Sequence, residues 1–173
     1  MDSVDNEIFD VVDSDDHVVG QAVRSEVHRL GLKHRAVHIL ISNCRGEIFL
    51  QKRSMTKDSW PGAWDSSASG HVDTGEDYDA AAIRELKEEL SWELAGPLKP
   101  VIKIDACADT GQEFAWVYRL EADGPFTLHP EEIDDGRWFS CREVERLLRN
   151  PGEQVAASFR WIWTELKAGG HVS

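Results

Sequence analysis

The sequence predicts a single α/β domain over residues 1–173, in which hairpins of short strands are layered with a few helices. Three observations favour this fold class. The period of the hydrophobic pattern changes several times between that of a strand and that of a helix. Clusters of turn residues separate the strand-like runs. A length of 173 residues with 41% hydrophobic content suffices for one core, and no internal repeat or low-complexity segment interrupts it.

The first part of the chain is expected to be mostly strand, over residues 8–12, 17–21, 36–42 and 47–51. The turn residues at 14–16 join the first two runs into an N-terminal β-hairpin over about residues 7–22. Gly46 permits the positive φ that a second hairpin needs between the last two runs. Between the hairpins, residues 25–30 favour one short helical turn that ends at Gly31.

The later elements alternate between strand and helix, with extended runs expected over residues 64–72, 98–107 and 114–121. Ser140 and Glu143 have the spacing of a capping box, which predicts a helix to about residue 149 that Pro151 stops. A last amphipathic helix is predicted from apolar residues spaced three and four apart, namely Val155, Phe159, Ile162, Trp163 and Leu166.

Composition narrows the class of function. Asp and Glu number 32 against 19 Lys and Arg, a formal charge of -13 that repels polyanions, so neither a nucleic acid polymer nor an anionic membrane is an expected partner. The three cysteines are widely spaced without a C-x-x-C pair, which favours neither a disulfide framework nor a zinc knuckle. The acidic N-terminus has no signal-peptide pattern. A cytoplasmic location is therefore expected.

A helix over about residues 77–90 carries an unusual concentration of charge. Asp77 or Asp79 can cap it, and Asp79, Ile83, Leu86 and Leu90 are predicted to form its buried stripe. Three glutamates stand beside that stripe at positions i, i+3 and i+4, namely Glu85, Glu88 and Glu89. Like charges at this spacing oppose folding by a few tenths of a kcal/mol per pair, which Arg84 offsets only in part.

A divalent cation would offset the remaining repulsion. Mg²⁺ takes carboxylate oxygens, waters and substrate phosphates in an octahedral shell, so the clustered glutamates suit a metal bound to a diphosphate. For the heptapeptide RELKEEL taken alone, a solvated surface face is the commoner explanation. The wider spacing decides between the two.

Gly70, Glu76 and the run Arg84-Glu85-Leu86-x-Glu88-Glu89 reproduce a spacing that resembles the Nudix box, G-x5-E-x7-R-E-U-x-E-E-x-G-U, where U is apolar. The match covers residues 70–92. Six fixed residues agree, a coincidence expected at on the order of one in ten million starting positions. Ser91 stands where the family has glycine, so a left-handed helix end there would cost serine roughly 1 kcal/mol.

The resemblance implies a Nudix α/β/α sandwich with a mixed sheet and a Mg²⁺-dependent, or Mn²⁺-dependent, hydrolase of nucleoside diphosphate derivatives or related organic pyrophosphates. Carried over residue by residue, the metal ligands would be the Gly70 carbonyl, Glu85, Glu88 and Glu89. Arg84 would orient the glutamates, and Glu76 would tie the loop to the helix. Glu88 and then Glu113 are the candidates for the general base.

The segment from about residue 18 through the box also resembles the branch of this superfamily related to isopentenyl diphosphate isomerase. The resemblance implies that Arg53 and Lys57 contact a diphosphate, although both would equally serve as ordinary surface residues. Isomerase chemistry needs a cysteine where this chain has Ser69, and Glu85 also departs from the isomerase pattern. Histidines fall at or near the isomerase metal ligands, namely His28, His34 and His71. A further ligand position is Glu113, but another is Gly111, so a complete isomerase site is not expected.

Other residues leave alternatives open. His28, His34 and His38 favour structural or polar roles, and Trp60 and Trp64 suit either a pocket wall or packing. Phe159, Trp161 and Trp163 favour a core or a dimer contact over base stacking, which leaves a homodimer open. The acidic run 131–135 favours a solvated loop over a metal or base contribution. The competing functions are an isomerase and a non-catalytic diphosphate-binding module, and the substrate stays unidentified.

Overall fold

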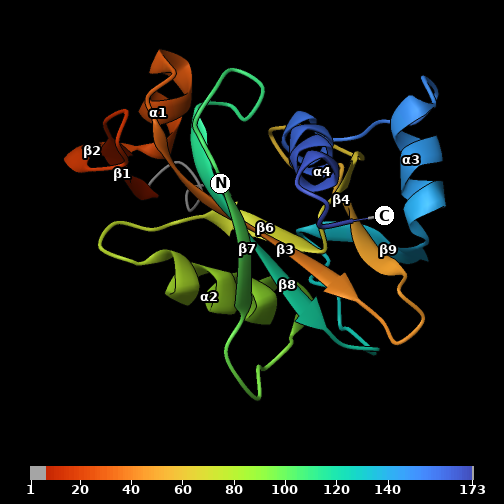
Figure 1. The fold of residues 1–173 in the computed structure, drawn as a ribbon. Helices are drawn as coiled ribbons and strands as arrows, with labels where there is room; N and C mark the ends of the chain where they lie inside the picture. The colour runs from red at the N-terminus through yellow and green to blue at the C-terminus, as the bar shows by residue number, and fades with distance from the viewer. Residues whose placement is uncertain (1–6, 173) are drawn as a thin grey trace.

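The computed structural model describes residues 7–172 and has the α/β architecture expected from the sequence (Figure 1). Its strands are β1 (Ile8–Val12), β2 (Val18–Val23), β3 (His34–Ser42), β4 (Ile48–Arg53), β5 (Trp64–Asp65), β6 (Ala68–His71), β7 (Lys99–Ile104), β8 (Glu113–Glu121) and β9 (Ile133–Phe139). Its helices are α1 (Arg24–Leu30), α2 (Tyr78–Leu90), α3 (Cys141–Arg149) and α4 (Ala157–Ala168). None of these helices is long and apolar enough to cross a membrane.

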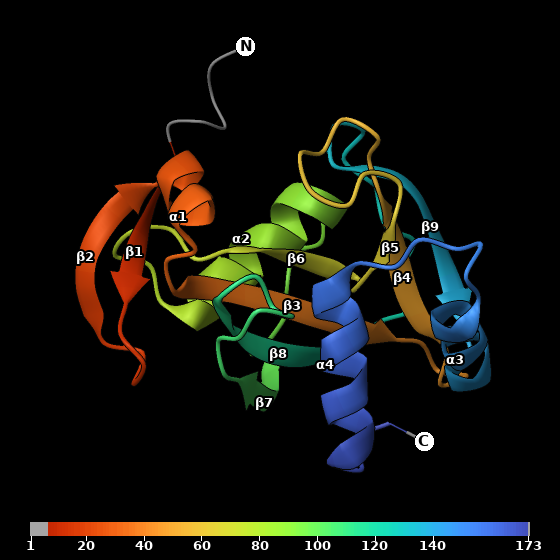
Figure 2. The ribbon, with the colours of Figure 1, turned by 90° about the horizontal axis from the view of Figure 1, so that it is seen from above.

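Strand β3 is the centre of a mixed seven-stranded sheet. It runs parallel to β8 and antiparallel to β4 and β6, while β4 also pairs with β5 and β9, and β8 with β7. Strands β1 and β2 form the predicted N-terminal hairpin as a separate two-stranded sheet, which lies with α1 at one end of the main sheet (Figure 2).

Alternation along the strands produces two cores, one on each side of the main sheet. Helix α2 covers one face, and α3 and α4 lie on the other, which makes a three-layered sandwich (Figure 1). Val37, Ile39 and Ile41 point to the α2 side, whereas Leu40 packs with Phe159 and the rest of the α4 core. Successive side chains of β3 point to opposite faces, and because both faces are buried the strand is apolar along most of its length.

Helix α2 ends as its sequence predicts, but its buried face is rotated. The Asp77 side chain accepts a hydrogen bond from the Ala80 amide at 2.8 Å. Ser91 takes the left-handed conformation with φ 51° that glycine would adopt more easily. The expected stripe is wrong at Asp79, which is exposed, and at Ile83, which is 46% exposed. The α2 residues that are buried are Ala81, Ala82, Glu85, Leu86, Glu89 and Leu90.

The structure of two further segments, residues 64–72 and 131–135, differs from the sequence-based expectation. The extended segment at 64–72 is split into β5 and β6 at Ser66 and Ser67, whose backbones turn from one sheet partner to another. The acidic run 131–135 is not wholly a loop, because β9 begins at Ile133, which is buried and pairs with Arg53 of β4. The apolar side chain of Ile133 packs in the α2 core, which explains why β9 begins within the acidic run.

The tryptophans separate into core and cavity residues. Trp64 and Trp163 are 5% and 2% exposed and belong to the α4 core, as does Phe159. Trp60 is 50% exposed. Together with the partly buried Trp161 it lines a shallow cavity of about 480 Å³. Packing therefore decides the role of Trp64, whereas Trp60 stands at a cavity wall.

Candidate functional site

A cavity of about 670 Å³ brings together every residue that the sequence singled out for metal binding, substrate binding or catalysis. Its walls come from the end of β4 and the loop after it, from β6, from α2 and from the start of β8. The site residues that line it are Arg53, Lys57, Gly70, Arg84, Glu85, Glu88, Glu89 and Glu113. Residues distant in sequence therefore line one cavity.

Gly70 allows the glutamates of α2 to approach the backbone of β6. A Cβ atom at this position would lie 2.0 Å from Oε1 of Glu85, so any other residue here would force the Glu85 carboxylate to move. The carboxylate thus occupies the space that any other residue at position 70 would fill. The present position of the Glu85 carboxylate therefore depends on glycine at position 70.

Two of the three clustered glutamates, which the sequence places beside the buried stripe of α2, are themselves buried. Glu89 is 4% exposed and accepts hydrogen bonds from Nε2 of Gln51 at 2.9 Å and from the Ser69 amide at 3.0 Å. Burial, then the charge of Glu85, raise the pKa of Glu89 well above its ordinary value. Burial also raises the pKa of Glu85 to about 7, against the opposing effect of Arg84. The protein alone leaves this negative charge undercompensated.

Arg84 of α2 connects this helix to the loop that precedes it. Its guanidinium donates to both carboxylate oxygens of Glu76, at 3.1 and 2.9 Å, and to the carbonyl oxygen of His71 at 2.9 Å. It also donates to Glu85 at 2.6 Å and to Glu88 at 3.1 Å. A charged fork of this kind fixes the direction of each carboxylate. The Glu88 side chain is 59% exposed and is the most accessible of the three glutamates.

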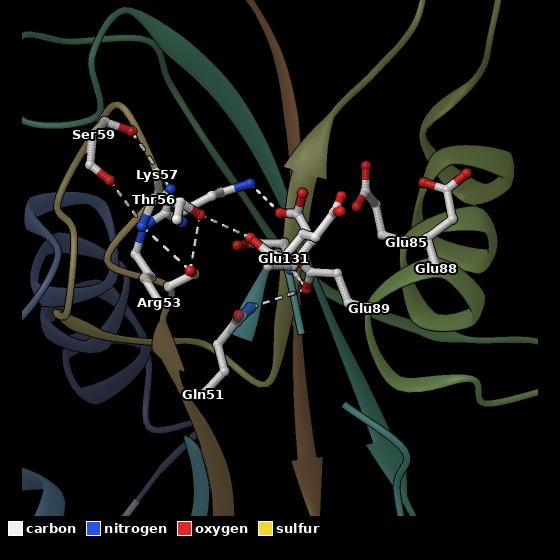
Figure 3. A network of polar contacts seen from close by, with 12 residues as sticks. Gln51, Arg53, Thr56, Lys57, Ser59, Glu85, Glu88, Glu89 and Glu131 are labelled. Atoms are coloured by element: carbon white, nitrogen blue, oxygen red, sulfur yellow. Dashed lines mark hydrogen bonds and ion pairs between the residues drawn. The ribbon is translucent and has the colours of Figure 1, made fainter. Parts of the chain in front are cut away.

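Opposite the glutamates lies a pair of cations, each held by a carboxylate (Figure 3). Nη1 of Arg53 lies 3.2 Å from Oδ2 of Asp65, and Nε of Arg53 donates to the Ser59 carbonyl at 3.1 Å. Lys57 forms an ion pair with Glu132. The sequence reasoning did not find Asp65, and it weighed the acidic run containing Glu132 mainly as a solvated loop.

Four side chains from four separate elements converge at a second position in the cavity. Ligand atoms of His28, His34 and His71 all lie within 4.8 Å of one another. Oε1 of Glu113 lies 3.1 Å from Nε2 of His71 and 3.5 Å from Nε2 of His34. Structural or polar roles for His28 and His34, which the sequence favoured, would not require their ring nitrogens to lie this close together.

The protonation pattern of this histidine cluster leaves a lone pair directed inward. Nδ1 of His34 donates to the Leu32 carbonyl at 2.9 Å, so Nε2 is the unprotonated nitrogen, and it is buried with no hydrogen-bond partner among residues 7–172. Burial lowers the pKa of His71 to about 4. Although burial alone would raise it, the neighbouring imidazoles of His34 and His71 hold the pKa of Glu113 far below its usual range. Neutral imidazoles with one carboxylate are a donor set for a transition metal.

The chain is similar to known proteins in both sequence and structure. Residues 32–160 match the family model described as NUDIX domain. A Nudix hydrolase of Yersinia pestis is 36% identical over 143 residues, which cover 80% of this chain and 75% of that protein. An isopentenyl-diphosphate Delta-isomerase of Serratia proteamaculans is 32% identical over 169 residues, covering 94% and 93% of the two chains. A crystal structure from Deinococcus radiodurans superposes with a TM-score of 0.82 at 29% identity and covers 92% of this chain and 98% of that chain.

Proposed function

This chain belongs to the Nudix family, as a hydrolase of pyrophosphate bonds, and on that premise we propose that it uses Mg²⁺ to cleave a diphosphate linkage in nucleoside diphosphate derivatives. The observation that carries the proposal is the meeting of buried Glu85 and Glu89 with exposed Glu88 in the cavity that also holds Arg53 and Lys57. Anionic ligands on one wall suit a metal, and cations on the other suit phosphate oxygens.

The residues of the glutamate wall fit a divalent cation. Glu85, Glu88, Glu89 and the Gly70 carbonyl would hold it, since they supply hard oxygen donors at a place where burial disfavours carboxylate charge. Mn²⁺ would suit the same donors. When bound, the metal neutralises the charge of the diphosphate and acidifies water. Arg84 keeps the glutamates aimed at one point.

Glu88 is the general base that accepts the proton of the attacking water. This carboxylate is the most exposed of the three and contacts Arg84 at 3.1 Å, so a water in the cavity can reach it and give up its proton there. Glu113 is less suited, because the neighbouring imidazoles of His34 and His71 hold its pKa far below its usual range. A carboxylate that is so strongly stabilised as an anion accepts a proton poorly.

Substrate binding falls to Arg53 and Lys57. The guanidinium of Arg53 is oriented by Asp65, and a fork fixed in this way can make two parallel hydrogen bonds to phosphate oxygens. Lys57 forms an ion pair with Glu132. When substrate binds, a phosphate group would take the place of Glu132 as the anionic partner of Lys57. Both cations lie across the cavity from the glutamates (Figure 3).

Isomerisation of isopentenyl diphosphate is the second candidate function, because the histidine cluster includes Glu113 and the Serratia relative bears the isomerase name. Ser69 lines the cavity at the position where isomerase chemistry needs a cysteine. A serine hydroxyl is far less acidic than a thiol and transfers protons less readily near neutral pH. The candidate is therefore secondary to hydrolysis.

A phosphate-release assay tests the proposal. The protein is incubated with a panel of nucleoside diphosphates, nucleoside diphosphate sugars and dinucleoside polyphosphates, with Mg²⁺ or with EDTA, and isopentenyl diphosphate is followed in parallel for isomerisation. Mg²⁺-dependent release that Glu88→Gln abolishes would support the proposal. Isomerised product without hydrolysis of any panel member would refute it in favour of the second candidate.

The organisation of residues 1–173 as one domain is also part of the proposal, as is a reducing, cytoplasmic setting. The three cysteines are free in the structure, and two of them, Cys107 and Cys141, are partly buried. Free thiols suit a reducing compartment. Sedimentation of the purified protein would distinguish a monomer from a homodimer.

A further inference from the structure

A chain of polar contacts joins His38 to Arg53, both of which line the cavity. Nδ1 of His38 lies 2.6 Å from Oγ of Ser66, whose hydroxyl also lies 3.2 Å from Oδ1 of Asp65. Oδ2 of Asp65 accepts the hydrogen bond from Nη1 of Arg53 at 3.2 Å. Every side chain of this relay except Arg53 is buried. The arrangement contains a Ser, a His and an Asp, but the serine bridges the other two.

The partners of Ser66 determine which nitrogen of His38 carries the proton. Asp65 faces the guanidinium of Arg53 and can only accept hydrogen bonds, so the single hydroxyl proton of Ser66 is directed to it as the stronger, charged acceptor. The hydroxyl oxygen must then accept from Nδ1 of His38. In neutral His38 the other nitrogen, Nε2, therefore carries a lone pair.

That lone pair stands at the cavity. His38 lies on β3 directly across from Ser69 of β6, the neighbour of Gly70, and both His38 and Ser69 are cavity-lining residues. Among residues 7–172, Nδ1 of His38 is engaged by Ser66, whereas Nε2 makes no hydrogen bond. The free acceptor thus belongs to a residue that lines the same cavity as the glutamate wall, Arg53 and Lys57.

An acceptor at this position selects the chemistry of its ligand. Phosphate oxygens at neutral pH carry no proton to donate, and an unprotonated nitrogen offers them none, so His38 does not serve the diphosphate itself. Burial lowers the pKa of His38, which keeps the imidazole neutral. The groups of a nucleotide that lie next to its phosphates and donate hydrogen bonds are the hydroxyls of the sugar.

We propose that Nε2 of His38 accepts a hydrogen bond from a sugar hydroxyl of the substrate, with Ser66 and Asp65 fixing the tautomer that makes this possible. The inference rests on the proposed function, because it assigns the sugar end of a nucleoside diphosphate derivative to this part of the same cavity. His38 is then a specificity residue, and Ser66 and Asp65 are positioning residues.

Binding of non-hydrolysable probes separates this role from catalysis. Calorimetry with Mg²⁺ compares α,β-methylene-ADP with its 2′-deoxy and 3′-deoxy forms. We expect the wild-type protein to prefer the ribose form over one of the deoxy forms by about fivefold, the value for one neutral hydrogen bond of about 1 kcal/mol. His38→Asn, whose amide reaches only as far as Nδ1, should lose the preference, and His38→Gln, whose amide reaches the Nε2 position, should keep part of it.

Several outcomes would overturn the inference. An unchanged sugar preference in a folded His38→Asn protein that still hydrolyses diphosphates would refute it and leave the proposed function intact. Equal loss of kcat for ribose and deoxyribose substrates would also refute it, since His38 would then act on water. No binding of any probe by the wild-type protein would refute the inference, while the phosphate-release assay decides the proposed function separately.

A second measurement does not depend on the folding of a His38 variant. The ¹⁵N chemical shifts of the His38 ring in the wild-type protein should report a proton on Nδ1. Ser66→Ala should shift them toward a mixture of tautomers and reduce the sugar preference. A wild-type ring with its proton on Nε2 would remove the basis of the inference.

Discussion

Nε2 of His71 lies 3.1 Å from Oε1 of Glu113, although the two residues are on strands that flank β3 on opposite sides. His34, at the start of β3, lies between them and has its buried Nε2 without a hydrogen bond among the described residues. Three strands therefore present donors to one point. Because a buried lone pair without a partner is costly, an ion at this point would relieve a defect in the fold.

Zn²⁺ should accordingly raise the melting temperature of the protein. A ligand present at 100 times its dissociation constant stabilises the native state by about 2.7 kcal/mol, which corresponds to several degrees for a chain of this size. His34→Asn should abolish the effect, since its amide can keep the bond to the Leu32 carbonyl while Nε2 is lost. The measurement is thermal melting with and without Zn²⁺.

His17→Asn is the matched control, because His17 belongs to an exposed group with Asp13 and Asp15 that could also take an ion. Stabilisation that survives His34→Asn but disappears in His17→Asn would place the ion in that turn and contradict the prediction.

Glu88→Gln should reduce kcat by a factor of about 10² to 10⁴, the usual contribution of a positioned general base, with no change in melting temperature. The side chain is 59% exposed, so its charge contributes little to the fold. Glu93→Gln serves as a control, because that glutamate is 80% exposed and lies just beyond α2. Retention of full kcat by Glu88→Gln would move the base elsewhere.

Glu89→Gln should stabilise the metal-free protein at pH 8 and have less effect at pH 5. Burial raises the pKa of Glu89 in the folded state, so the native state binds more protons than the unfolded state between these values, and its stability falls as the pH rises. The variant removes that loss. Thermal melting in EDTA across this pH range measures the difference between the two proteins.

The depressed pKa of His71, about 4, has the opposite sign and destabilises the native state as the pH falls below 6.5. It acts on both proteins, so it cancels in their difference. A variant that is less stable than the wild type at every pH would show that the carboxylate bonds to Gln51 and Ser69 outweigh the buried charge.

Arg53→Ala should lower kcat/KM by the equivalent of about 2 kcal/mol, roughly 30-fold, mainly through KM and with little change in the Mg²⁺ requirement. The substitution also leaves buried Asp65 without its guanidinium. The double variant Arg53→Ala with Asp65→Asn should therefore recover stability without recovering kcat/KM. Arg137→Ala, on the neighbouring strand β9, is the control, and unchanged kinetics in Arg53→Ala would locate the diphosphate elsewhere.

Ser69→Cys should not create isopentenyl diphosphate isomerase activity, because Glu85 and Gly111 also depart from the isomerase pattern. Product analysis by mass spectrometry with isopentenyl diphosphate provides the measurement. The variant should fold normally, since the Ser69 backbone amide, which donates to Glu89, is unaffected. Isomerised product in either protein would favour the second candidate function.

Local spacing in the sequence was sufficient to predict the glutamate wall. Glu85, Glu88 and Glu89 are adjacent on one helix, so 3.6-residue periodicity alone brings them together. The same periodicity was wrong for Ile83, because a helix that packs against a sheet at one angle buries Ala81 and Ala82 in its place. The direction in which a helix faces depends on its partner, which the helix sequence does not specify.

Contacts between distant elements could not be predicted in this way. Asp65 partners Arg53 only because β5 pairs with β4, and Glu132 partners Lys57 because the chain returns beside β4 before β9. The histidine cluster also depends on α1, β3 and β6 meeting in space, and in the sequence only the resemblance to the isomerases pointed to it. Such convergence follows from sheet order, for which a single sequence provides little information.

The central position of β3 has a consequence for the way the protein moves. This strand is hydrogen-bonded to β8 along residues 34–42 and to β6 or β4 over much of its other edge. Its amide hydrogens should therefore exchange with solvent only when the whole molecule unfolds, whereas the loop that carries Lys57 and Trp60 is tied to no such ladder. We therefore expect β3 to stay fixed when a ligand binds and the loop that carries Lys57 and Trp60 to move. Differences in substrate size would then be accommodated by the loop.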